Sequence, residues 1–307
     1  MPALATAPGS RILAAKPVTL SAPNRGDDLA VRISAPATGT DLPLLVLAHG
    51  FSLAMDSYDP LVDHWAANGF IVIQPTFLDS AALGLTPADP RYASIWSTRV
   101  DDVELVIDHL DEVVAAIPGL PERVDRDRLA VAGHSWGSQT VGMLLGARVV
   151  GADGRPGEDR TDPRVKAGVL LAATGLGGEA LTPFARENFS FMSPDFDRLN
   201  TPTLVVAGDH DQSLLSTRGP DWFTDVYALS PGARSLLTVF GGEHTLGGVH
   251  GYNATNTTDE SPERVDLVRR VSAAFLLKAL GLGDDAWDRI TEEVSSAPEP
   301  VGRIDSK

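Results

Sequence analysis

Five residues near the middle of the chain, Gly133-His134-Ser135-Trp136-Gly137, have the types and spacing of a serine nucleophile on a sharp turn. The apolar segment 128–133 before them predicts a strand, and 136–150 predicts a helix. A serine hydroxyl is a weak nucleophile unless a base takes its proton and donors stabilise the oxyanion. A strand–turn–helix junction exposes the hydroxyl and places free helix N–H groups beside it. We therefore predict that Ser135 is a catalytic nucleophile. The alternative is a glycine-serine turn that only packs a helix on a strand.

An acid of suitable type follows a later strand-like segment. Residues 201–208 are apolar and are followed by Asp209 and Asp211. We predict that Asp211 is the acid, because it lies three residues past Gly208, where the loop has cleared the strand end. Asp209 stays open as the alternative, although its expected role is to cap the turn or position the loop.

The base is expected after the last predicted strand, because nucleophile-elbow hydrolases carry their triad in the order Ser, Asp, His. His244 lies four residues after the end of segment 233–240 and is the predicted base. His250, further along the glycine-rich loop, is the fallback, and a surface histidine is the alternative interpretation for both. We predict no metal and no cofactor. A metal cluster at 209–211 is not expected, since consecutive residues rarely converge on one ion.

Two backbone N–H donors should stabilise the oxyanion. One is expected at Trp136, directly after the nucleophile, and the other at Phe51, after the apolar run 42–50 that ends in His49-Gly50. The expected role of His49 is to shape this turn, and the alternative is an ordinary strand exit. The side chains of Phe51 and Trp136 would then flank the scissile carbonyl.

These residues need a sheet that brings the ends of separate strands together. Strand-like and helix-like segments alternate, which predicts an α/β fold with a mostly parallel sheet of about eight strands and helices on both faces. The expected strands cover 12–20, 28–35, 42–50, 70–75, 128–133, 166–173, 201–208 and 233–240. The expected helices include 58–69, 97–117, 136–150 and 262–280. We predict one catalytic domain, 1–280, and a tail, 281–307, with a short helix and a Pro-rich end that frays.

Composition narrows the classes of partner. The chain has 307 residues and no cysteine, which excludes disulfides and a thiol nucleophile. Its formal net charge is −16, which disfavours binding to nucleic acid and to anionic membranes. No run of 18 apolar residues predicts a membrane span. Without a visible secretory signal we expect a cytoplasmic monomer or homodimer acting on a small or lipophilic ester.

At this point the sequence resembles the α/β-hydrolases over roughly residues 28–280. The segments "LVLAHGF", "ANGFIVIQP", "GHSWGS" and "VVAGDHDQS" look like the branch that holds chlorophyllases, dienelactone-hydrolase-like esterases and polyester hydrolases or platelet-activating-factor acetylhydrolases. The resemblance implies a Ser135–His244–Asp211 triad and an oxyanion hole at Phe51 and Trp136. The chain departs from chlorophyllases at Trp136, where Arg or Met is usual.

The substrate side is expected around the segment between two strands, 174–200. Its length predicts a small cap or no lid. The apolar side chains of Phe189, Phe191 and Met192, together with Phe51 and Trp136, are the predicted substrate-binding residues. The equal alternative is that the side chains of this segment, Phe184 included, pack the loop onto the body.

The predicted reaction is hydrolysis of a carboxylic ester through an acyl-enzyme. The same groups could cleave an amide or work as a cofactor-free perhydrolase. A catalytically silent, hydrolase-like binding protein is the non-enzymatic alternative.

Overall fold

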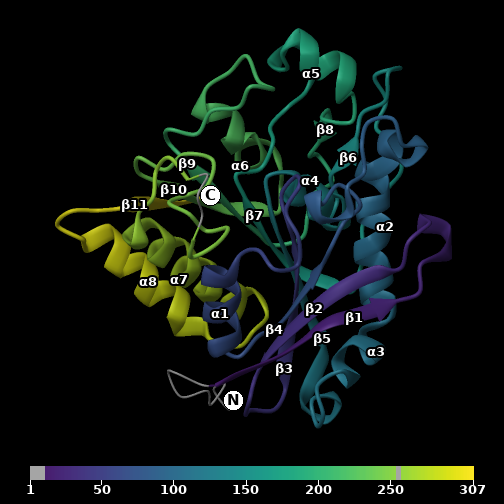
Figure 1. Ribbon diagram of the computed structural model, residues 1–307. Helices are drawn as coiled ribbons and strands as arrows, with labels where there is room; N and C mark the ends of the chain where they lie inside the picture. Colours follow the sequence, from purple (N-terminus) through teal and green to yellow (C-terminus); the bar gives the residue numbers. More distant parts are fainter. Residues whose placement is uncertain (1–10, 254–256) are drawn as a thin grey trace.

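The computed structural model describes residues 11–253 and 257–307 and shows a central sheet between two layers of helices (Figure 1). Residues 1–10, at the start of the predicted domain, and 254–256, in the loop after His244, lie outside the described residues. The strands are β1 Ile12–Leu20, β2 Leu29–Pro36, β3 Leu42–Ala48, β4 Ile71–Pro75, β5 Val124–His134, β6 Arg148–Val149, β7 Val165–Leu171, β8 Pro194–Asp195, β9 Thr203–Gly208, β10 Ala233–Val239 and β11 Gly302–Ser306. The helices are α1 Asp59–Ala67, α2 Ile95–Asp108, α3 Leu110–Ala115, α4 Trp136–Leu145, α5 Pro183–Asn188, α6 Asp225–Leu229, α7 Pro262–Ala279 and α8 Asp284–Ser296.

The large sheet has nine strands in the order β1-β2-β4-β3-β5-β7-β9-β10-β11. The six strands from β4 to β10 pair in parallel, and β1, β2 and β11 pair antiparallel at the two edges. The predicted mostly parallel α/β sheet is therefore confirmed, with one strand more than expected. Parallel pairing brings the carboxyl ends of β3, β5, β9 and β10 to one edge, where functional loops of such sheets gather.

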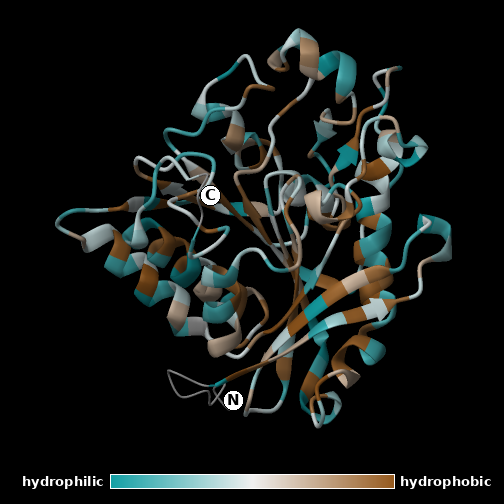
Figure 2. Cartoon of the chain, in the orientation of Figure 1, coloured by the Kyte–Doolittle hydropathy of each residue, from teal (hydrophilic) through white to brown (hydrophobic). Residues whose placement is uncertain are grey.

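Two apolar clusters cover the two faces of the sheet. The central strands are buried on both sides, and their sequences are almost entirely hydrophobic. The outer faces of the helices are polar (Figure 2). Helices α2, α3, α4 and α6 share one cluster with the sheet, and α1, α7 and α8 share the other. This double cover holds the loops at the sheet edge on a rigid base.

Three details of the predicted elements were wrong. The expected helix 136–150 ends at Leu145, because Gly146 adopts a left-handed backbone conformation (φ 119°) and the chain continues into β6. The expected helix 97–117 is two helices, because the backbone leaves helical geometry at His109 (φ −110°, ψ 26°). The Pro-rich end does not fray over 302–306, because it forms β11, which pairs with β10. The expected short helix of the tail is α8, whose Trp287 ring lies 5.5 Å from that of Phe275 on α7.

The segment between β7 and β9 forms only a small cap, as predicted. It contains the six-residue helix α5 and strand β8, which pairs with β6 in a separate two-stranded ribbon. In Figure 1 this cap lies at the top, beyond the carboxyl end of the sheet. The loop after Asp211 supports it, because the N–H of Thr182 donates to the carbonyl of Leu215.

Candidate active site

Ser135 occupies a strained turn between β5 and α4. Its backbone angles, φ 55° and ψ −120°, lie where non-glycine residues are rarely found. The turn is tight: a Cβ on Gly133 would lie 2.2 Å from the Gly137 carbonyl oxygen, and one on Gly137 would lie 2.0 Å from that of Ala48. Only glycine fits at these two positions. The strain is held in part because the Ser135 N–H donates to the carbonyl of Leu171 on β7, at 2.9 Å.

The structure brings Ser135, His244 and Asp211 together from the ends of β5, β10 and β9. The His244 Nε2 lies 2.8 Å from the Ser135 Oγ, and its Nδ1 lies 3.1 Å from each carboxylate oxygen of Asp211. An ionised carboxylate only accepts, so Nδ1 carries the proton and Nε2 is free to take the serine proton. The Asp211 side chain is fully buried, whereas that of His244 is 39% exposed. Burial raises the pKa of Asp211, and the hydrogen bond from His244 opposes this rise.

The two alternative residues have other partners. Asp209 accepts the Gly241 N–H at 2.6 Å, so it braces the loop after β10. His250 accepts the Tyr58 N–H through its carbonyl oxygen, and burial lowers the pKa of its imidazole. Over 11–253 and 257–307, no three His, Asp or Glu side chains are grouped as metal ligands.

The two predicted oxyanion residues lie side by side. The rings of Phe51 and Trp136 meet edge to face, with centroids 5.3 Å apart. His49 shapes the turn after β3: its Nδ1 donates to the Gly50 carbonyl at 2.7 Å, and its Nε2 accepts the Phe77 N–H at 3.0 Å. Burial lowers the pKa of His49 to about 3, so the ring stays neutral.

Comparison with known proteins shows what this chain is similar to. A family profile described as Chlorophyllase matches residues 9–148, the part that carries Phe51, Ser135 and Trp136. The chain has the α/β-hydrolase fold. Its resemblance to the chlorophyllase and platelet-activating-factor acetylhydrolase branch of these serine esterases is confirmed by this profile and by the relatives below.

Two kinds of curated relative are similar to this chain. Chlorophyllase-1, chloroplastic, of Citrus unshiu is 30% identical over 166 residues, which cover 48% of this chain and 46% of the relative. Platelet-activating factor acetylhydrolase of Canis lupus familiaris is 25% identical over 304 residues, which cover 83% of this chain and 61% of the relative. The chain thus spans less than two thirds of the length of these relatives.

A buried ion pair, missed in the sequence, holds the loop that carries Phe51. The Arg99 Nη1 lies 2.6 Å from an Asp79 carboxylate oxygen, and both side chains are at most 1% exposed. Arg99 also donates to the His49 carbonyl, while the other Asp79 oxygen accepts the Ser52 N–H at 3.1 Å. Phe51 is therefore fixed on both sides. Burial lowers the pKa of Arg99, and Asp79 opposes this.

The same guanidinium reaches the helix behind the nucleophile. Arg99 Nε donates to the Thr140 hydroxyl at 3.0 Å, and that hydroxyl donates to the Trp136 carbonyl at 3.0 Å. Arg99 thus supports the loop of Phe51 through the His49 carbonyl and the Trp136 backbone through Thr140. A buried Arg and Asp, 20 residues apart on a helix and a loop, carry no sequence pattern by which we could have paired them.

A second buried carboxylate, also missed, holds the loop that carries His244. Asp259 accepts the N–H groups of Glu243 and Gly247 at 2.7 and 2.9 Å, and the Thr245 hydroxyl at 2.9 Å. These donors lie on both sides of His244. Asp259 stands in a polar stretch of "TTDESPE", where one of several acidic residues gave no signal.

The predicted substrate-binding side chains form a connected aromatic group. Trp136 contacts Phe191 and Phe189, with ring centroids 5.2 and 6.5 Å away, and Phe189 contacts Phe184 at 5.8 Å. Phe51 and Phe184 are more than half exposed, whereas Trp136 is 7% exposed. Met192 is 4% exposed and lies in the core, which favours the packing interpretation for this residue.

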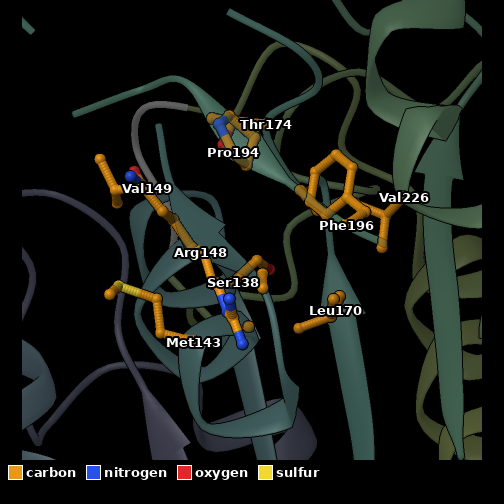
Figure 3. Close-up of a pocket in the computed structure, with 13 residues that line it drawn as sticks. Ser138, Met143, Arg148, Val149, Leu170, Thr174, Pro194, Phe196 and Val226 are labelled. Atoms are coloured by element: carbon orange, nitrogen blue, oxygen red, sulfur yellow. The ribbon is translucent and has the colours of Figure 1, made fainter. Parts of the chain in front are cut away.

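Figure 3 shows a small cavity lined in part by α4, which is not the substrate site. Its lining includes Ser138, Met143, Leu170, Phe196 and Val226, which come from α4, β7 and the segments around β8 and α6. Its volume is about 20 Å³, the size of a single water site, so an ester cannot bind there. The aromatic group of Phe51, Trp136, Phe189 and Phe191 remains the candidate substrate surface.

Proposed function

We propose that this chain is a serine hydrolase that cleaves a carboxylic ester through an acyl-enzyme. The observation that carries the proposal is the hydrogen-bonded series Ser135–His244–Asp211 on a strained elbow. The names of the relatives, a chlorophyllase and an acetylhydrolase, support ester substrates. Described helices are all too short or too polar to cross a membrane.

In the proposed mechanism, the Ser135 Oγ attacks the ester carbonyl while His244 Nε2 takes its proton. The backbone N–H groups of Phe51 and Trp136 stabilise the oxyanion. His244 then protonates the leaving alcohol, and water attacks the acyl-enzyme by the same route. Asp211 holds the imidazole tautomer that makes both transfers possible.

The test is hydrolysis of p-nitrophenyl butyrate by the Ser135→Ala variant. We expect kcat/KM to fall by about 10⁴-fold or more, because the nucleophile is gone and only binding and the oxyanion donors remain. The Ser272→Ala variant is the control, since this buried hydroxyl on α7 accepts the Trp65 Nε1–H and donates to the Arg269 carbonyl, and should matter only for stability. Turnover retained by folded Ser135→Ala, judged by circular dichroism, would disprove the mechanism.

For the substrate we propose that the aromatic group from Phe51 to Phe184 binds the apolar part of the ester. Its exposed ends and its contact with Trp136, next to the nucleophile, support this. A panel of p-nitrophenyl esters of increasing acyl length should show KM falling with length. A flat panel would contradict this surface.

A further inference from the structure

Two buried side chains beneath the site, Tyr58 and His134, join the loops that flank the nucleophile. The Gly50 N–H donates to the Tyr58 hydroxyl oxygen at 2.9 Å, and this oxygen lies 2.9 Å from the His134 Nδ1. The His134 Nε2 lies 2.7 Å from the carbonyl oxygen of His244. Tyr58 is 0% and His134 4% exposed, so water does not compete for these bonds.

The donors and acceptors of this series can be assigned without ambiguity. A carbonyl only accepts, so the His134 Nε2 carries a proton and donates to His244. The neutral ring then accepts at Nδ1, so the Tyr58 hydroxyl donates to it. Burial lowers the pKa of His134 to about 3 and raises the pKa of Tyr58, which keeps both groups neutral as this assignment requires.

We propose that Tyr58 and His134 form a positioning bridge that sets the distance between the oxyanion loop, 49–53, and the histidine loop, 241–251. The bridge runs from Gly50 to the backbone of His244 through His134, the residue directly before Ser135 in the chain. Neither side chain hydrogen-bonds to the Ser135 Oγ or to the His244 imidazole, so both act through the groups they position. The proposal rests on the function proposed above.

Further contacts make the bridge rigid. The Tyr58 N–H donates to the His250 carbonyl at 2.8 Å, so Tyr58 is tied to the histidine loop through its backbone as well. A Cβ on Gly50 would lie 3.2 Å from the Tyr58 hydroxyl and 3.3 Å from the His134 Nδ1, so position 50 has no spare room. The rings of His134 and His244 also contact each other, with centroids 5.2 Å apart.

A rigid link here matters because acyl transfer needs the base and the oxyanion donors in a fixed relation. A displacement of about 1 Å in such a site can cost roughly 100-fold in rate. Two apolar rings could fill the same volume, but they would leave the Gly50 N–H and the His244 carbonyl without partners. Because each donor and each acceptor in the hydrogen-bonded series is fixed, the series specifies a single arrangement of the two loops.

The first test is the Tyr58→Phe variant, which removes only the hydroxyl. We expect kcat for p-nitrophenyl butyrate to fall about 10- to 100-fold with KM within about twofold, since binding surfaces are untouched. Tyr252→Phe is the control, because its hydroxyl lies at the surface near Asp63 and the variant should keep wild-type kcat. An unchanged kcat in Tyr58→Phe would overturn the bridge.

The second test asks whether both side chains act as one unit. His134→Phe and the double variant with Tyr58→Phe should lose the same kcat as either single variant, because each breaks the same series. Multiplying losses would overturn the proposal. Ser135→Ala is measured alongside: an active Ser135→Ala defeats the proposed function itself, whereas an inactive one with normal Tyr58→Phe defeats only the bridge.

A third measurement uses the intact protein and does not depend on any variant folding. Nitrogen NMR of ¹⁵N-histidine-labelled protein, with His134 assigned, should show the Nε2–H tautomer at neutral pH. An Nδ1–H tautomer or an imidazolium would reverse the assigned donors and overturn the bridge.

Discussion

The oxyanion loop and the histidine loop both rest on a buried carboxylate, but the two carboxylates are bound differently. Asp79, under the oxyanion loop, is paired with the Arg99 guanidinium, which itself bonds the loop and helix α4. Asp259, under the histidine loop, accepts two backbone N–H groups and one hydroxyl of the loop it supports. The oxyanion loop is therefore held to the body of the protein by an ion pair. The histidine loop is held by the hydrogen bonds that its neutral donors form with Asp259.

The difference matters because of what remains when one partner is removed. Loss of one member of a buried ion pair leaves an uncompensated charge, at a cost of about 3–5 kcal/mol. A carboxylate among neutral donors can be replaced by an amide whose oxygen still accepts the two N–H groups, so that at most one donor loses its partner, at a cost of about 1–3 kcal/mol. We therefore expect the oxyanion loop to be the more easily broken and the histidine loop to be the more tolerant.

The largest effect is predicted for Arg99→Met. It should destabilise the fold by about 3–5 kcal/mol, because Asp79 keeps a buried charge. It should also lower kcat by about 10²-fold or more as the oxyanion donors lose their support. Urea unfolding and p-nitrophenyl butyrate kinetics measure the two effects. Arg289→Met, which removes an exposed helix ion pair, is the control and should cost less than about 1 kcal/mol.

The double variant Arg99→Met with Asp79→Leu sharpens this test. Stability should recover in part, because no buried charge is left alone. Activity should not recover, because the His49 carbonyl and the Ser52 N–H still lack their partners. Full recovery of kcat would show that the pair serves stability alone.

A smaller effect is predicted for Asp259→Asn. The amide oxygen can still accept from the loop, so we expect a loss of about 1–2 kcal/mol in stability and roughly 10-fold in kcat. Asp259→Ala should exceed it in both measurements. If Asp259→Asn proved as damaging as Arg99→Met, the contrast between the two loops would be wrong.

Much of this site could be predicted from the sequence because its residues follow strands in order. Ser135, Asp211 and His244 each lie just past a recognisable apolar run, and the structure brings these three together. Arg99, Asp79 and Asp259 were missed since their partners lie on distant segments and include backbone groups of the loops. Such contacts depend on how loops fold over the sheet edge, which no local pattern records.

Prediction of the fold from the sequence was limited for the same reason. The periodicity of buried strands predicted the parallel core, whereas β11 was missed because "GRIDS" is short, polar and half exposed. An edge strand of this kind gains its structure from pairing with β10 rather than from its own residues.

A pH dependence is shared by both loops, because each contacts one buried neutral histidine. Burial lowers the pKa of His49 and of His134 to about 3. The unfolded chain binds protons near pH 6.5, so stability is complete above that pH and falls as pH drops towards 3. Each histidine should contribute about 1.4 kcal/mol per pH unit.

Urea unfolding at pH 7, 6, 5 and 4 measures this slope in the wild type and in His134→Gln. As the pH falls, the free energy of unfolding of the variant should decrease less steeply than that of the wild type. The difference between the two slopes should correspond to about one proton. Equal slopes would mean that His134 takes up its proton in the folded state as readily as in the unfolded chain.

The central claim, that Ser135 is the nucleophile, is tested most directly by locating a covalent adduct. The protein is treated with a fluorophosphonate, digested and examined by tandem mass spectrometry. We predict one phosphonyl group per chain, on Ser135, formed at a rate that falls sharply in Asp211→Asn. An unlabelled Ser135, or an adduct on another serine while esterase activity is lost, would contradict the account.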